Sequence, residues 1–195
     1  MNVYDFDKTI YDGDSTLDWF FYCMKRQPAI VKAFPRQIFG AGLYFLGKIE
    51  KTAYKAYFFS FLQYLRGVDS LLEAFCQKNQ RKIKHWYCLQ KREDDVVISA
   101  SPLFLIERFC RVEGVSRVIA SDVDLYTGKF QGVNCRGEEK VRRFREQFGT
   151  AEIDAFYSDS KSDLPLAQLA RKAFLIKGNQ IEKWDISSET GKSPV

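Results

Sequence analysis

Short apolar runs alternate with longer amphipathic stretches over most of the chain. The runs with the length and the branched or aromatic content of buried strands are residues 2–6, 96–98, 117–121, 153–157 and 173–176. The later stretches with helical spacing are residues 102–111, 138–148 and 164–171. Strands that alternate with helices in this way predict an α/β fold, in which a parallel sheet is covered on both faces to give three layers.

A long helical stretch separates the first predicted strand from the second. It begins at Ser15, which together with Asp18 resembles a capping box. Its densely aromatic part at 52–66 is expected to be a helix that Gly67 closes. Asp69 is then placed to cap the following helix.

This pattern divides the chain into two interleaved parts. We expect a core domain formed by residues 1–13 and 93–186, a helical domain inserted at 14–92, and a loose polar tail at 187–195. The length of 195 residues suits one globular domain with a modest insertion. A hydrophobic content of 46% and an aromatic content of 15% are enough for a packed core and argue against disorder.

Charge, cysteine content and histidine content bear on the kind of ligand, the cellular compartment and the type of metal site. The net charge of +5 suits an anionic ligand, and nucleic acid, acidic lipid and phosphate esters all fit it. The five cysteines form no CxxC pair and follow no export signal, so we expect a reduced, cytoplasmic protein. His85 is the only histidine, so any metal would be held by carboxylates, which favour a hard cation.

Polar side chains follow several predicted strands or begin the next helix, and ligands bind at the carboxyl ends of the strands in sheets of this kind. These candidates are Asp5, Asp7, Ser99, Lys140, Asp159 and Asp163. Each alone has a plainer explanation, because aspartates also solvate strand ends or cap helices, and lysines also belong to solvated basic faces. Their order along the chain distinguishes them.

Taken in that order, the positions resemble the haloacid dehalogenase superfamily of phosphatases, subfamily IB. The matching stretches are Asp5-Phe6-Asp7-Lys8-Thr9, Ile98-Ser99-Ala100-Ser101, Lys140 and Asp159-Ser160-Lys161-Ser162-Asp163. The resemblance implies a Rossmann-like core with an inserted α-helical cap of the C1 type, which shuts over the site and selects the substrate. It also implies an enzyme that hydrolyses phosphoric monoesters with Mg²⁺ as cofactor.

The resemblance further implies a role for each group that phosphoryl transfer requires. Asp5 would attack phosphorus and form an aspartyl-phosphate, while Asp7 would act first as an acid and then as a base. Ser99 with the following amide would donate to a phosphoryl oxygen. Lys140 would supply a fixed cation, with Arg136 as its substitute.

A magnesium site is implied by the same resemblance. Mg²⁺ would lie between Asp5, the main-chain carbonyl of Asp7 and Asp159, and Asp163 would support these ligands from behind.

Asp7 also separates two branches of the superfamily, because dehalogenases expel halide without a proton and lack this second aspartate. The sequence therefore favours a phosphate ester.

The inserted helices bear on the substrate, because they are unusually aromatic and basic. Their longest uncharged run, residues 37–47, is too short to span a bilayer. It could lie in a membrane interface as an amphipathic helix, or its aromatic residues could pack the cap together; both interpretations are open. The stretches at 25–28, 101–102, 135–140 and 157–161 are similar to the phosphatidylglycerophosphatase C type, which implies a lipid phosphate at the inner membrane face.

The predicted function is thus Mg²⁺-dependent hydrolysis of a phosphomonoester, on a lipid or glycerol-type phosphate such as phosphatidylglycerophosphate. The alternative within the enzyme class is a soluble small-metabolite phosphatase, since phosphoserine phosphatases resemble this chain in the cap position and at Ser99 and Lys140. The alternative outside it is a catalytically silent phosphate- or lipid-binding module. The expected partners are a phosphorylated small molecule or lipid and, through the cap, an anionic membrane surface. Nucleic acid is not expected, and the oligomeric state is left open.

Overall fold

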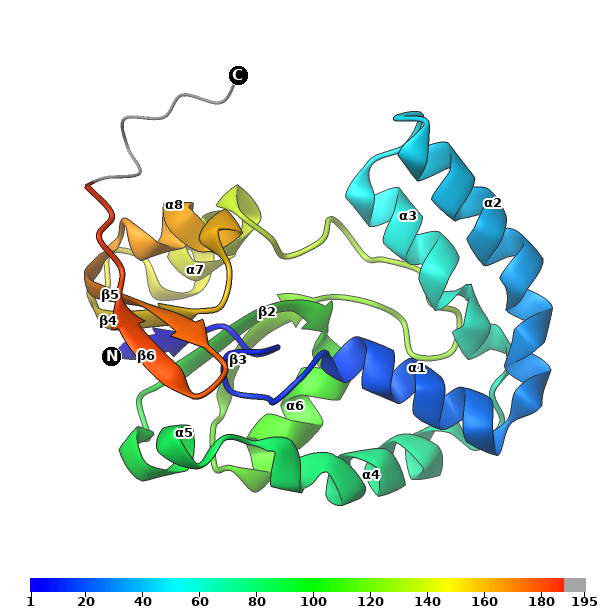
Figure 1. The fold of residues 1–195 in the computed structure, drawn as a ribbon, viewed down its shortest axis with the longest axis horizontal. Coiled ribbons are helices and arrows are strands. Elements are labelled where there is room, and N and C mark those ends of the chain that lie inside the picture. Colours follow the sequence, from blue (N-terminus) through cyan, green and yellow to red (C-terminus); the bar gives the residue numbers. More distant parts are fainter. Residues whose placement is uncertain (188–195) are drawn as a thin grey trace.

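A six-stranded sheet forms the centre of the protein (Figure 1). In the computed structural model, which describes residues 1–187, the strand order is β3-β2-β1-β4-β5-β6. The strands are β1 (Asn2–Tyr4), β2 (Val96–Pro102), β3 (Arg117–Ser121), β4 (Ile153–Ser158), β5 (Ala170–Lys177) and β6 (Gln180–Lys183). Neighbouring strands are parallel except for β5 and β6, which pair antiparallel at one edge. The predicted α/β class with a mostly parallel sheet is confirmed.

Helices cover both faces of the sheet, as the three-layer prediction required. The helices are α1 (Ser15–Arg26), α2 (Phe34–Phe45), α3 (Lys51–Phe58), α4 (Val68–Asn79), α5 (His85–Gln90), α6 (Leu103–Val112), α7 (Glu138–Phe148) and α8 (Leu164–Ala167). Successive residues of a strand point to opposite faces. Accordingly, Tyr4 packs in one buried cluster with Phe109 of α6, while Val3 packs in the other with Phe144 of α7 and Leu166 of α8.

The whole stretch from α1 to α5 lies between β1 and β2, so it is an insertion in the sheet's connectivity. Figure 1 shows α2 and α3 as a pair of packed helices that project from the molecule on the side away from β6. In contrast, Phe75 of α4 and Tyr87 of α5 belong to the same buried cluster as Tyr4. The division into a core at 1–13 and 93–186 and a cap at 14–92 therefore stays a prediction. The predicted tail at 187–195 lies, beyond its first residue, outside the described part of the chain.

Two helix boundaries in the insertion differ from the prediction. The cap of α1 is Asp14 rather than Ser15, because the Asp14 carboxylate accepts a hydrogen bond from the Leu17 amide at 3.0 Å. Gly67 begins α4 instead of closing a helix: it has a left-handed φ of 58° and precedes Val68. The predicted cap Asp69 instead lies inside the first turn, where a carboxylate interacts favourably with the helix dipole.

Three further elements also depart from the predicted pattern. The helix expected at 52–66 is α-helical only to Phe58 and continues as a 3₁₀ helix over Phe59–Tyr64. The helix expected at 164–171 stops at Ala167, since residues from Ala170 onward pair with β4 and tertiary pairing overrides local preference. Strand β6 was not predicted, and its residues are all exposed, so it shows no alternation of apolar and polar positions.

Candidate active site

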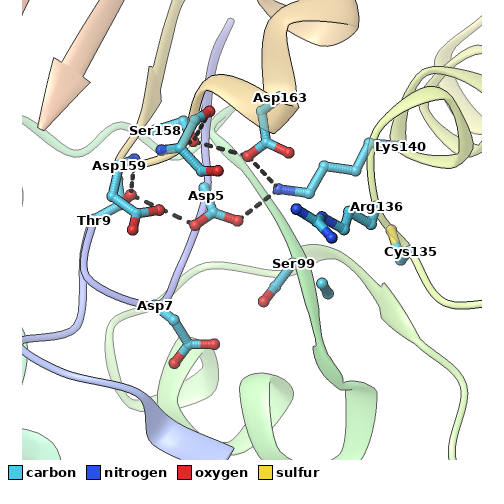
Figure 2. A network of polar contacts seen from close by, with 12 residues as sticks. Asp5, Asp7, Thr9, Ser99, Cys135, Arg136, Lys140, Ser158, Asp159 and Asp163 are labelled. Atoms are coloured by element: carbon cyan, nitrogen blue, oxygen red, sulfur yellow. Dashed lines mark hydrogen bonds and ion pairs between the residues drawn. The ribbon is translucent and has the colours of Figure 1, made fainter. Parts of the chain in front are cut away.

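Asp5 directly follows β1 at the carboxyl edge of the sheet. Its amide donates to the Tyr157 carbonyl at 2.8 Å, which extends the β1–β4 pairing by one residue. Its carboxylate is buried, with Oδ1 2.6 Å from Lys140 Nζ. The other oxygen, Oδ2, accepts a hydrogen bond from the Thr9 hydroxyl at 3.5 Å. Two donors on opposite sides thus fix the orientation of the Asp5 carboxylate (Figure 2).

Lys140 is the third residue of α7, and its side chain is completely buried. Its Nζ lies 2.6 Å from Asp5 and 2.8 Å from Oδ2 of Asp163, so one cation joins two carboxylates (Figure 2). Burial alone would lower the pKa of the ammonium, but the two carboxylates outweigh it and hold the pKa of Lys140 above its ordinary value. Lys140 rather than Arg136 is therefore the cation that contacts Asp5.

The effect of burial on the pKa of Asp5 is larger than the opposing effect of Lys140. Burial raises the pKa of Asp5 from 3.8 to about 7; Lys140 opposes this, and the nearby Asp163 and Asp159 add to it. The local group of one lysine and two aspartates carries excess negative charge. This arrangement would be relieved by a further cation, and it supports a carboxylate that exchanges its proton readily near neutral pH.

Asp7 lines the same cavity but points away from Asp5 in Figure 2. Its carboxylate accepts hydrogen bonds from the Ser101 hydroxyl and from the Ser15 amide, the latter at 2.6 Å. Burial, together with the neighbouring Asp14 carboxylate, raises the pKa of Asp7 in spite of these donors. A carboxyl group with a raised pKa is suited to hold and release a proton.

The loop after Asp7 has a constrained backbone. Lys8 adopts a left-handed φ of 60°, which is unfavourable for a residue with a side chain, and its amide donates to the Gly13 carbonyl at 2.8 Å. The buried Lys84 ammonium binds the Lys8 carbonyl and also the Gly178 carbonyl. Such strained positions persist where surrounding contacts enforce them, often beside functional groups. Here the contacts hold the backbone directly after Asp7.

The remaining predicted residues lie around the same centre. Ser99 is buried in the middle of β2, and its Oγ accepts a hydrogen bond from the Ser101 amide at 3.1 Å. Asp163 is buried, and besides its ion pair with Lys140 it accepts a hydrogen bond from the Ser158 hydroxyl at 2.8 Å. Asp159 is partly exposed, its amide donates to the Thr9 hydroxyl at 2.9 Å, and burial raises the pKa of its carboxyl.

The donor set suits a hard cation that retains water ligands. The carboxylates of Asp5 and Asp159 lie beside each other, whereas the carboxylate of Asp163 forms an ion pair with Lys140 (Figure 2). Over residues 1–187, no three acidic, cysteine or histidine side chains are grouped closely enough to hold a metal by themselves. Mg²⁺ usually keeps several waters and needs only one or two carboxylates, so these residues fit it better than they fit a cation that requires a full protein cage.

A cavity of about 390 Å³ opens between these groups and the inserted helices. The strand-end residues form its floor, and side chains of α3, including Lys51, Tyr54, Lys55 and Phe58, form the opposite wall. The centre is thus accessible to a small ligand, and the insertion supplies part of the surface that such a ligand would touch.

Four contributors to this site were not assigned roles from the sequence: Thr9, Ser101, Ser158 and Lys55. Thr9 and Ser101 belong to the stretches that carry the resemblance, so their positions offered a signal. Ser158 likewise belongs to the similar stretch at 157–161, whereas Lys55 offered no signal, because a lysine on an aromatic helix is common. A separate observation concerns membranes: none of the described helices has the length and apolar character needed to cross a bilayer.

Two curated proteins are similar in sequence to part of this chain. Protein CicA of Caulobacter vibrioides is 35% identical over 81 residues, covering 38% of this chain and 36% of that protein. Histidinol-phosphatase of Neisseria meningitidis is 28% identical over 104 residues, 47% of each chain. The chain thus matches less than half the length of these curated relatives.

Solved structures share the fold over most of the chain. A Bordetella pertussis protein of unknown function has a TM-score of 0.69 and 21% identity, covering 89% of this chain and 87% of that one. A phosphoserine phosphohydrolase-like protein from Francisella tularensis has a TM-score of 0.55 and 14% identity, covering 89% and 86%. The family model for haloacid dehalogenase-like hydrolase matches residues 3–168, which include all six predicted site residues. The chain belongs to the haloacid dehalogenase-like hydrolases, as the sequence predicted.

Proposed function

We propose that this protein is a Mg²⁺-dependent phosphomonoesterase that forms an aspartyl-phosphate on Asp5. The observation that carries the proposal is the buried Asp5 carboxylate, fixed by Lys140 at 2.6 Å, in a cavity that also exposes the carboxyl of Asp7. A nucleophile and a second carboxyl group with a raised pKa are the two groups that ester hydrolysis through a covalent intermediate requires.

The proposed reaction has two displacements at phosphorus. In the first, an Asp5 oxygen bonds to phosphorus and the ester P–O bond breaks, while protonated Asp7 gives its proton to the departing oxygen. In the second, Asp7 takes a proton from water, the water oxygen bonds to phosphorus, and the Asp5–phosphorus bond breaks. Inorganic phosphate leaves, and both aspartates regain their starting protonation states.

Ser99 and Lys140 would stabilise the charge on the phosphoryl oxygens. Ser99 and Ala100 lie midway along β2 and line the cavity that Asp5 also lines. Lys140 is already oriented by Asp5 and Asp163, so it needs no rearrangement to act as a fixed cation. Asp163 would therefore serve mainly to position Lys140.

Asp5, Asp159 and the main-chain carbonyl of Asp7 are the groups proposed to hold the metal. When bound, Mg²⁺ would supply positive charge that offsets repulsion between the carboxylates and the phosphate. A thermal-shift titration tests this separately from turnover: Mg²⁺ should raise the melting temperature of the wild type but not of Asp159→Asn. Asp122→Asn, outside the cavity, is the control that should respond like the wild type.

Two substrate classes are consistent with the site. Histidinol-phosphatase among the relatives and the phosphoserine phosphohydrolase-like neighbour support a soluble phosphorylated metabolite. Large apolar side chains along α2 and at its C-terminal cap support a lipid phosphate instead, because Ile38, Phe39, Phe45 and Leu46 are 71%, 60%, 86% and 70% exposed.

Flotation with anionic vesicles separates these classes. A membrane-associated enzyme should float with the vesicles, and the double variant Phe45→Ser, Leu46→Ser should lose this behaviour. Leu89→Ser is the matched control, since Leu89 is 74% exposed on α5, away from the α2–α3 pair. Absence of wild-type flotation would leave the metabolite class.

Hydrolysis itself is tested by phosphate release from p-nitrophenyl phosphate, with Mg²⁺ and with a chelator. Wild type should turn over only with the metal, and Asp5→Asn should be inactive. A catalytically silent binding module would release no phosphate from any ester, whereas an enzyme that rejects this artificial substrate would hydrolyse another one, so a panel of phosphorylated metabolites and lipids distinguishes the two.

A further inference from the structure

Three basic side chains that line the cavity form no ion pair with a carboxylate of residues 1–187. Lys51 and Lys55 come from α3, and Arg136 comes from the segment before α7. Lys51 and Lys55 are four residues apart, so they lie on one face of their helix. Among the ion pairs of residues 1–187, none includes any of these three. In the described part of the chain, the guanidinium of Arg136 has a single hydrogen-bond partner, the Ser162 hydroxyl, 3.4 Å from its Nε.

Lys55 is held in place by neutral groups. Its Nζ donates to the Ala100 carbonyl at 2.7 Å and to the Asn134 side-chain oxygen at 2.8 Å. An ammonium has three N–H donors, so one remains for a ligand. Asn134 is itself fixed by the Ser121 hydroxyl, which donates to the same oxygen at 3.2 Å.

The neighbouring carboxylates offset the charge of this cluster only in part. Burial, followed by repulsion from Lys51, lowers the pKa of Lys55 to about 8, although Asp7 and Asp14 oppose the shift. Burial and then repulsion from Arg136 also lower the pKa of Lys51. Cations that destabilise one another in a ligand-accessible cavity would be stabilised by an anion bound between them.

We propose, on the basis of the phosphomonoesterase function above, that Lys51, Lys55 and Arg136 bind a second anionic group carried by the leaving part of the substrate. The transferred phosphoryl group has its own partners in Ser99 and Lys140, so it does not need this cluster. Tyr54 and Phe58, also on the α3 wall, provide an apolar surface for the carbon skeleton beside the cluster. The physiological ester therefore has a carboxylate or a further phosphate beyond its ester oxygen.

The cluster also disfavours esters whose leaving group is cationic. Histidinol phosphate carries an amine and an imidazole, so it should be a poor substrate in spite of the relative with that activity. The charge of the leaving group, and not merely its size, should therefore control specificity.

Three small esters of similar size isolate this charge: 3-phosphoglycerate (anionic leaving group), glycerol 3-phosphate (neutral) and phosphoethanolamine (cationic). For the wild type we expect kcat/KM to fall in that order, with roughly a tenfold or larger advantage of the first over the second. Lys51→Gln should reduce this ratio severalfold. Lys51→Glu should reduce it further, because Lys55 and Arg136 are then partly offset by a carboxylate, and an acidic residue in the first turn of α3 suits the helix dipole, so folding is not at risk.

Lys48→Glu is the matched control, because Lys48 is an exposed lysine next to α3 that does not line the cavity. It should leave the order and the ratios as in the wild type. Arg136→Gln provides an independent second variant and should also reduce the ratio. Turnover of all three esters at similar kcat/KM, unchanged by these substitutions, would overturn the second anion site and leave the phosphomonoesterase proposal intact. Failure to hydrolyse any ester would instead overturn the proposed function together with this inference.

Discussion

Lys140 Nζ lies 2.6 Å from Oδ1 of Asp5, although 135 positions separate the two residues in the sequence. The pair joins the start of α7 to the residue after β1. The same Lys140 Nζ lies 2.8 Å from Oδ2 of Asp163. One buried cation facing two carboxylates leaves a net negative charge. The net negative charge beside Asp5 repels a doubly charged phosphate ester. This repulsion is the physical reason to expect a metal beside Asp5, in addition to the cations elsewhere on the cavity.

Replacing Lys140 should therefore remove both an orienting contact and a phosphate ligand. We expect Lys140→Met to lower kcat/KM by at least about 100-fold. Steady-state kinetics with a saturating metal concentration measures this. Arg142→Gln on the same helix is the control, because its side chain is 58% exposed and its ion pairs should contribute little. Near wild-type activity in Lys140→Met would exclude Lys140 from the reaction.

The proposed acid, Asp7, makes a prediction that depends on the leaving group. In Asp7→Asn, p-nitrophenolate needs no proton to depart, so the first displacement should still occur, whereas alkyl esters should lose about 10²- to 10⁴-fold in rate. The second displacement lacks its base in either case. Stopped-flow absorbance should thus show a burst of about one p-nitrophenol per active site followed by slow turnover. An equal loss for both kinds of ester, without a burst, would argue against this role.

The raised pKa of Asp5 predicts how stability depends on pH without metal. Between pH 3.8 and about 7, folded Asp5 keeps a proton that the unfolded chain has released. Folding then takes up a proton, so the contribution of Asp5 to stability falls as the pH rises, by at most about 1.4 kcal/mol per pH unit. Asp5→Asn should gain stability relative to the wild type across this interval, as measured by urea unfolding in chelator. A difference that is constant with pH would contradict the assignment.

Two glycines of α2 should respond oppositely to alanine. A Cβ on Gly40 would lie 2.4 Å from Cβ of Tyr57, so Gly40→Ala would force α2 away from α3 and cost about 1–3 kcal/mol. Within residues 1–187, no atom other than its chain neighbours and the backbone of its own helix lies within 4 Å of such a Cβ on Gly42, and Gly42→Ala should stabilise the helix by up to about 1 kcal/mol. Urea unfolding of the two variants gives the signs directly. Equal effects would mean that α2 and α3 do not pack this closely.

Much of the fold and site could be predicted from the sequence, because both depend on local patterns. Strand runs such as 117–121 are bounded by polar residues, and parallel strands bring their carboxyl ends to one edge. Asp5 and Ser99, each at the end of an apolar run, were therefore expected to lie near each other, and both line the cavity. Lys140 could be identified only from its place in the order of motifs.

The remaining features depend on distant contacts that leave no local pattern. Lys55 matters because its ammonium reaches Ala100 and Asn134, 45 and 79 positions away. Strand β5 begins at Ala170, within a stretch with helical spacing, because β4 is available as its neighbour. The edge strand β6 is stabilised by pairing with β5 alone and buries none of its residues, so hydrophobic alternation could not reveal it.

The proposed mechanism is tested most directly by identifying the residue that carries phosphate during turnover. Wild-type protein quenched during hydrolysis would be reduced with borohydride, which converts an aspartyl-phosphate to homoserine, and the tryptic peptide of residues 1–8 would be sequenced by mass spectrometry. We expect homoserine at position 5, an unmodified Asp7, and no conversion in Asp5→Asn. An unmodified position 5 in actively turning-over enzyme, or sustained hydrolysis by Asp5→Asn, would contradict covalent catalysis by Asp5.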